Sequence, residues 1–171
     1  AGLALQPAFT SGRFDAKRAL PMSAGDVIFQ LAEQSEGLLA PYDIWPLGCS
    51  NPLCDTGVFL VKGEPPEGVA AHPSGFYPAT RALTMEEYRA GYSPDSPQGS
   101  VFLDILAKRG VFVGTGLSVV IMNYMDAVSM DVQRLRECSM MVTVPDGRAI
   151  PFCSYHLTNS AGERVYTPWC K

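Results

Sequence analysis

The sequence predicts an α/β fold that ends in a small, irregular α+β lobe carrying cysteines. Strand-like and helical segments alternate through the first part of the 171-residue chain, whereas the last part has the pattern of a hairpin. The 16 glycines and 14 prolines predict many turns between short elements. We expect two parts, residues 1–62 and residues 63–171.

The first two elements have clear sequence signals. The apolar run at 3–9 predicts a buried strand, and a helix is expected over 23–36. Ser23 and Asp26 have the spacing of a helix N-cap and its partner, and Gly37 is a typical C-terminal stop. The helix should therefore be bounded by local signals at both ends.

Two stretches rich in turn residues follow, with a strand between them. Residues 38–57 contain three prolines and two glycines, which favours an ordered loop over regular structure. The apolar run at 58–61 predicts a strand. Residues 63–83 are again rich in proline and glycine, so we expect a long connection there.

Two helices are expected next. Thr84 and Glu87 have the spacing of a capping box, which predicts a short helix over 85–90. Apolar periodicity predicts a second helix over 101–108, with Gly110 as its stop.

The last elements form the expected lobe. The β-branched run at 117–122 is the strongest strand signal in the chain. A helix at 131–138 should lead into strands at 139–144 and 149–155, joined by the turn Pro-Asp-Gly-Arg at 145–148.

Composition and charge exclude several classes of protein. The net charge of −4 does not provide the basic surface that nucleic-acid binding needs, so we expect no nucleic-acid partner. No apolar run reaches 18 residues, which excludes a transmembrane helix. The chain begins on a predicted strand, without an initiator Met or a signal-peptide pattern, and we expect it to be a piece of a longer polypeptide.

The five cysteines are the main chemical signal. Their odd number, without a secretion signal, argues against a disulfide framework and favours reduced thiols in the cytoplasm. Reduced thiols serve as core residues, as ligands of a metal or cluster, or as nucleophiles. The five are Cys49, Cys54, Cys138, Cys153 and Cys170.

Two segments place cysteines in proline-framed backbone. In 46–54, prolines precede and separate Cys49 and Cys54, and such pinning lowers the entropy cost of gathering two thiolates around one inorganic centre. In 145–155, Cys153 follows a proline and a phenylalanine after the predicted turn. Partly desolvated thiolates of this kind are typical ligands of iron–sulfur clusters.

These segments, with others in the same order, resemble one branch of the radical S-adenosylmethionine (radical SAM) enzymes. That branch includes the methanopterin-methylating enzymes and the archaeal tetraether lipid synthases. The similar stretches contain the patterns QP-x3-SGR, DVI…EQ, P-x2-C-x2-P-x-C, YMDA…D-V…C and PDGR-x-IPFC-x-Y, and lie at 3–13, 26–34, 46–54, 124–138 and 144–155.

The resemblance implies the C-terminal half of such an enzyme. The Cys-x3-Cys-x2-Cys motif that binds the cluster cleaving S-adenosylmethionine does not occur in this sequence. The implied fold is the closing βα units of a partial barrel in 1–62, followed by an accessory iron–sulfur lobe in 63–171. The implied ligands of an auxiliary [4Fe–4S] cluster are Cys49, Cys54 and Cys153, with Cys138 as the fourth and Cys170 as the alternative fourth; three ligands with an open iron are also compatible.

The implied activity is radical methylation or C–C coupling at an unactivated carbon of a pterin-like or lipid small molecule. Gln6, Ser11 and Arg13 lie near or just past the end of the first predicted strand, where barrel enzymes place ligand contacts, and are the expected cofactor-binding residues. The implied partners are the N-terminal radical SAM core, which would hold most of the S-adenosylmethionine, and an electron donor such as ferredoxin or flavodoxin. No catalytic residue is assigned, and this half alone should be inactive.

Two other interpretations remain open from the residues alone. A structural or binding protein could hold one zinc ion through Cys49, Cys54, Cys138 and Cys153. Alternatively, all cysteines could be core or loop thiols of a metal-free α/β interaction domain.

Overall fold

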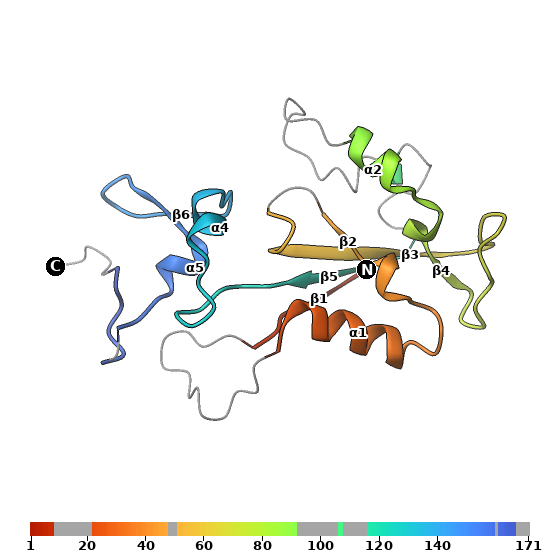
Figure 1. Ribbon diagram of the computed structural model, residues 1–171, viewed down its shortest axis with the longest axis horizontal. Helices are drawn as coiled ribbons and strands as arrows, with labels where there is room; N and C mark the ends of the chain where they lie inside the picture. The colour runs from red at the N-terminus through yellow and green to blue at the C-terminus, as the bar shows by residue number, and fades with distance from the viewer. Residues whose placement is uncertain (9–21, 48–50, 92–105, 108–115, 160, 167–171) are drawn as a thin grey trace.

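The computed structural model describes residues 1–8, 22–47, 51–91, 106–107, 116–159 and 161–166 (Figure 1). These residues form a mixed α/β structure with a five-stranded sheet in the order β1-β5-β3-β2, in which β4 also pairs with β3. A separate hairpin, β6–β7, belongs to the other end of the molecule. The strands are β1 (Gly2–Leu5), β2 (Trp45–Pro46), β3 (Asp55–Lys62), β4 (Phe76–Pro78), β5 (Gly116–Met122), β6 (Met141–Thr143) and β7 (Ala149–Pro151). The helices are α1 (Ala24–Gln34), α2 (Met85–Gly91), α4 (Val132–Arg136) and α5 (Phe152–Tyr155), with 3-10 turns η2 (Pro41–Asp43) and η3 (Ala79–Ala82).

Strand β5 connects the sheet to the second end of the molecule. It pairs in parallel with β1 and antiparallel with β3, where Asp55 lies opposite Met122. The first residue of β3 and the last residue of β5 therefore lie at the same edge of the sheet, where β1 also ends. Beyond this edge the chain continues into α4, β6 and α5 (Figure 1). Loops from distant parts of the sequence are thus brought together there.

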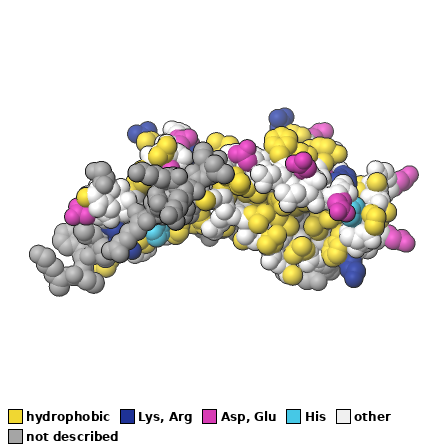
Figure 2. Space-filling model, turned by 90° about the horizontal axis from the view of Figure 1, so that it is seen from below, with side chains coloured by type: hydrophobic (Ala, Val, Ile, Leu, Met, Phe, Trp, Pro, Cys, Tyr) yellow, Lys and Arg dark blue, Asp and Glu magenta, His cyan; other side chains and the backbone are white. Residues whose placement is uncertain are grey.

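The central strand β3 is buried on both faces. Val58 and Leu60 join the core that packs against α1, whereas Phe59 on the opposite face packs with Ala79 and Leu106. A strand covered on both faces reads as a continuous apolar run rather than an alternating one. Seen from below, many hydrophobic side chains remain at the surface of the part of the molecule that holds the sheet (Figure 2).

The predicted capping of the first helix is confirmed. The Asp26 N–H donates to Ser23 Oγ at 3.2 Å, and the Ser23 N–H donates to Asp26 Oδ2 at 2.8 Å. The helix ends at Gln34, and Gly37 follows with a φ of +90°. The capping box of α2 is confirmed in the same way, because the Thr84 N–H donates to Glu87 Oε2 at 2.8 Å.

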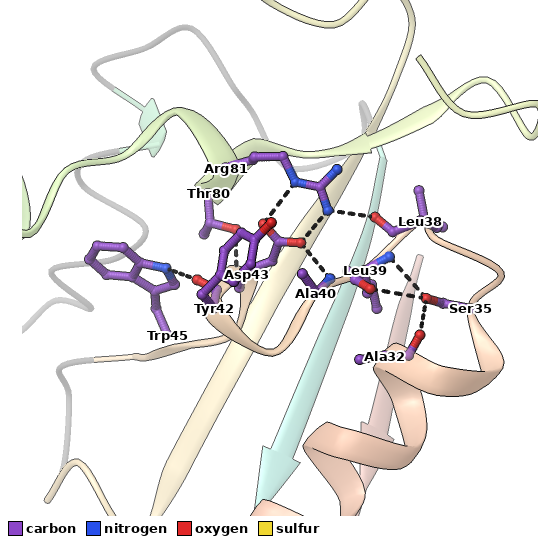
Figure 3. Close-up of polar contacts among 10 residues, drawn as sticks. All are labelled: Ala32, Ser35, Leu38, Leu39, Ala40, Tyr42, Asp43, Trp45, Thr80 and Arg81. Atoms are coloured by element: carbon purple, nitrogen blue, oxygen red, sulfur yellow. Dashed lines mark hydrogen bonds and ion pairs between the residues drawn. The ribbon is translucent and has the colours of Figure 1, made fainter. Parts of the chain in front are cut away.

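A buried ion pair holds the two turn-rich stretches together (Figure 3). The Asp43 side chain is fully buried in η2, and Arg81 of η3 donates from Nε to Asp43 Oδ1 at 3.0 Å. Arg81 Nη2 also donates to the Leu38 carbonyl at 3.0 Å, and the Ala40 N–H donates to Asp43 Oδ2 at 2.7 Å. These contacts fix η2 against η3, although the two turns are far apart in the sequence.

The prediction that 38–57 and 63–83 lack regular structure is wrong in part. Strand β2 and the first residues of β3 lie in the first stretch, and β4 lies in the second. Both β2 and β4 are short strands that exist because they pair with β3. Pairing of this kind depends on the partner strand and leaves little signal in the local sequence.

The predicted strand over 149–155 is also wrong beyond Pro151. Strand β7 ends at Pro151, which cannot donate a ladder hydrogen bond, and Phe152 begins the short helix α5. The Ser154 hydroxyl donates to the Pro151 carbonyl at 2.9 Å and closes this turn. Cys153 therefore lies on a helix rather than a strand.

The buried strand expected at 3–9 is wrong in part, because β1 covers only Gly2–Leu5 and is mostly exposed. The remaining expected elements differ mainly in length. The strand at 117–122 is confirmed as β5, and the helix at 131–138 is shorter, ending at Arg136. Most of the predicted helix at 101–108 lies outside the described residues, and its described pair, 106–107, is helical. The division at residue 62 stays a prediction; β4 and β5, which lie beyond it, pair into the same sheet as β1 and β3. No helix within the described ranges has the length and apolar character needed to cross a bilayer.

Candidate metal centre

Three cysteines from separate segments line one small pocket. Cys54 precedes β3, Cys138 follows α4 and Cys153 lies on α5. The cavity has a volume of about 40 Å³ and is mostly apolar. Its other lining residues are Asn51, Asp55, Met122, Asn123, Tyr124, Met140 and Phe152.

Cys54 is held by the edge where β3 begins and β5 ends. The Asn123 N–H donates to the Cys54 carbonyl at 2.8 Å, and the Asn123 side-chain amide donates to the Leu53 carbonyl at 3.2 Å. The Cys54 N–H donates to the Asn51 carbonyl at 2.8 Å, which closes a tight turn. The sheet register therefore determines the position of this cysteine.

Cys138 is placed by the end of α4. Asp131 caps the start of this helix by accepting from the Gln133 and Arg134 N–H groups. Past its end, the Cys138 N–H donates to the Leu135 carbonyl at 3.3 Å, and the Cys138 thiol donates to the Met140 carbonyl at 3.2 Å. The side chain is partly exposed.

Cys153 is placed by the hairpin that precedes α5. The Phe152 N–H donates to the Met140 carbonyl at 2.9 Å, and the Met125 N–H donates to Cys153 Sγ at 3.4 Å. Burial raises the pKa of the Cys153 thiol, an effect that the Met125 N–H partly offsets; the nearby sulfur atoms of Cys138 and Cys54 raise the pKa further.

Arg134 is a buried residue of this site that the sequence did not single out. Its Nη2 donates to Cys54 Sγ at 3.2 Å, to the Leu53 carbonyl at 3.2 Å and to the Asn123 carbonyl at 3.0 Å. Its position in the segment resembling the radical SAM branch was the only signal that could have pointed to it. The burial of its guanidinium depends on the three-dimensional fold.

The other predicted site residues are distributed as follows. Cys49, Cys170, Ser11 and Arg13 lie outside the described residues. Gln6 is exposed at the end of β1, and its side-chain amide points to Met122 Sδ at 3.8 Å. Gln6 therefore lies next to a residue that lines the cysteine pocket.

Gln6 also lines a second cavity, between the end of β1 and α1. This cavity has a volume of about 260 Å³ and is wider and more open than the cysteine pocket. Apolar and amide side chains share its wall. The lining residues are Leu5, Gln6, Met22, Val27, Gln30, Leu31 and Gln34.

Three thiols line the cysteine pocket, and thiolates are the usual protein ligands of zinc ions and iron–sulfur clusters. Among the described residues, no three His, Cys, Asp or Glu side chains are close enough to hold a single metal ion. A tetrahedral zinc site brings its sulfur ligands to about 3.8 Å from one another, whereas a cubane cluster separates them by about 7 Å.

No family model and no curated protein matches the chain. The candidate centre combines three thiols, two N–H donors directed at sulfur and a largely apolar wall.

Proposed function

We propose that this chain is the C-terminal portion of a radical SAM enzyme and that it holds an auxiliary [4Fe–4S] cluster. The observation that carries the proposal is that Cys54, Cys138 and Cys153 come from three separate segments and line one pocket. Cys49, five positions before Cys54, is the remaining proposed ligand. The resemblance of segments 46–54 and 144–155 to this enzyme branch is the second line of support.

The residues around the pocket suit such a centre. The N–H group of Met125 and the guanidinium of Arg134 donate to sulfur atoms, and donors of this kind stabilise thiolate ligands and tune reduction potentials. Part of the pocket wall is apolar or aromatic, which limits the access of water; it is formed by Met122, Tyr124 and Phe152. A bound cluster would supply one-electron redox chemistry for radical methylation or C–C coupling.

One strand pair, β1 with β5, supports the barrel part of the proposal, whereas β3 runs antiparallel to β5. Strands β1 and β5 are parallel, and Gln6 lies at the carboxyl end of β1, where barrel enzymes bind their ligands. The cavity beside Gln6 is a candidate site for part of the cosubstrate or of a pterin-like or lipid substrate. The proposed partners are the N-terminal radical SAM core and a ferredoxin- or flavodoxin-like donor in the reducing cytoplasm.

The test is anaerobic reconstitution of the full chain with ferrous iron and sulfide. We expect a brown protein that absorbs at about 400 nm and contains about four iron and four sulfide. The variants C54S and C153S should each bind less iron than the wild type while keeping its far-UV circular dichroism. A thermal unfolding curve of each metal-free variant separates ligand loss from misfolding.

Two other results would overturn the proposal. A colourless protein that retains one equivalent of zinc would instead favour the structural zinc site. A protein that takes up neither metal, and whose stability is unchanged in C54S and C153S, would instead favour a metal-free interaction domain.

A further inference from the structure

We infer that Arg134 is a positioning residue that holds the Cys54 sulfur in place and raises the reduction potential of the centre bound there. The inference rests on the proposed function, because it concerns the same cluster. It goes further by assigning a role to a residue that is not a ligand and does not line the pocket.

The charge of Arg134 is the first part of the argument. Arg134 is only 8% exposed, and a guanidinium stays protonated in a protein interior. A buried cation without a counter-charge is strongly destabilising. Within the described part of the chain, no carboxylate forms an ion pair with it; its acceptors are two carbonyl oxygens and Cys54 Sγ. Of these three atoms, the sulfur is the one that can carry a full negative charge, as a thiolate.

The geometry of the guanidinium is the second part. One nitrogen, Nη2, contacts both Leu53 and Cys54 before β3 and Asn123 after β5. Arg134 therefore connects the two strand ends that set the position of Cys54. Its Nε is buried and has no hydrogen-bond partner among the described residues. Buried polar groups are normally hydrogen-bonded, so the hydrogen bonds of the guanidinium do not fully explain why an arginine is buried here.

The consequence concerns the electronics of the bound centre. A positive charge 3.2 Å from a ligand sulfur stabilises the more negative, reduced state more than the oxidised state. Removing that charge should therefore lower the midpoint potential. A purely structural arginine would affect folding without a directed change in potential.

Arg136 provides a matched control on the same helix. It lies two residues after Arg134 in α4, carries the same charge and is exposed. Solvent screens its charge from the pocket. R134Q and R136Q thus remove the same charge from the same helix, but only the first removes a contact to sulfur.

The experiment compares reconstituted wild type, R134Q, R134K and R136Q by anaerobic redox titration and by electron paramagnetic resonance of the reduced protein. We expect R134Q to have a lower midpoint potential and a changed spectrum, and R136Q to match the wild type. R134K keeps the charge but cannot reproduce the planar fork, so its potential should lie between those of R134Q and R136Q. If circular dichroism shows that R134Q does not fold, the midpoint potentials and spectra of R134K and R136Q are compared instead, and a difference between them supports the inference.

Each contrary result has its own meaning. If cluster-loaded R134Q has the same midpoint potential and spectrum as R136Q, this inference is overturned and the proposed function stays in place. If R134Q does not fold, the same conclusion follows when R134K and R136Q have the same midpoint potential and spectrum. A wild-type protein that takes up no iron would overturn the proposed function, and this inference with it.

Discussion

Arg81 Nε donates to Asp43 Oδ1 at 3.0 Å, and the two residues are 38 positions apart in the sequence. The Asp43 side chain has no exposed surface, so its carboxylate depends on protein donors alone. The Ala40 N–H and the Arg81 guanidinium supply them. The packing of η2 against η3 therefore depends in part on this ion pair, together with the hydrogen bond from Arg81 to the Leu38 carbonyl.

Replacing Arg81 with methionine should lower the free energy of unfolding by about 3 kcal/mol, because it leaves a buried carboxylate without its counter-charge. Urea denaturation of the metal-free protein measures this loss. R89M, which removes an exposed arginine from α2, is the control and should change stability by less than about 1 kcal/mol. The double variant D43N/R81M should be more stable than R81M; if it is less stable, the ion pair does not explain the loss.

The capping box of α1 predicts a pH-dependent contribution to stability. Hydrogen bonds from the Ser23 N–H and hydroxyl lower the pKa of Asp26 below its usual value of 3.8. The ionised form is thus favoured in the folded state, so the stabilisation is present above the unfolded pKa and is lost as the pH falls through the folded pKa. D26N should lower the melting temperature at pH 7, and this difference from wild type should disappear at about pH 2. A difference of constant size down to that pH would contradict the assignment.

The parts of the fold that could be predicted from the sequence are those with local causes. The N-caps of α1 and α2 follow from Ser23 and Thr84 and from the acidic residues three positions later, all within one turn of helix. Strand β5 could be predicted because three consecutive β-branched residues, 119–121, lie within it. In contrast, β2 and β4 form only where β3 is available to pair with them, and that partner is remote in sequence.

The candidate site was predictable to a similar degree. Proline-framed motifs pointed to Cys54 and Cys153, whereas the helical position of Cys153 depends on where β7 stops at Pro151. Arg134 is an arginine in a short polar helix, and nothing in its neighbourhood predicts burial. Its role emerges only when the ends of β3 and β5 meet beside it.

The close contact of β3 with β5 makes Gly116 intolerant of a side chain. A Cβ atom on Gly116 would lie 1.9 Å from the Leu60 carbonyl oxygen, which is backbone and cannot move aside. G116A should therefore lower the free energy of unfolding by at least about 2 kcal/mol. G25A is the matched control, because a Cβ there comes no closer than 3.4 Å to Ser23 Oγ; it should leave stability unchanged or raise it by up to about 1 kcal/mol. Equal urea midpoints for the two variants would contradict the described β3–β5 pairing.

The environment of Cys153 predicts slow alkylation in the metal-free protein. Burial raises the pKa of its thiol above the usual 9.0, so less of the reactive thiolate is present at pH 8 than in the unfolded chain. Mass spectrometry of iodoacetamide-treated protein should show slower modification of Cys153 without urea than with it.

The same pKa shift links Cys153 to stability at high pH. As the pH rises above about 9, the unfolded thiol ionises before the folded one, so the free energy of unfolding should fall. The fall should be steeper in wild type than in C153S. Parallel pH profiles for the two proteins would show that the partial burial of Cys153 does not raise the pKa of its thiol.

The fourth ligand of the proposed cluster can be assigned by comparing C138S with C170S. Cys138 lines the pocket with Cys54 and Cys153, and its thiol already lies 3.2 Å from the Met140 carbonyl at the pocket wall. C138S should therefore lose about a quarter of the bound iron or more on reconstitution, since a cubane that lacks one thiolate readily loses an iron. C170S should keep the full iron content and the visible spectrum of wild type. The reverse pattern would assign Cys170 as the fourth ligand, and full retention of iron in both variants would indicate a centre held by three thiolates with one open iron.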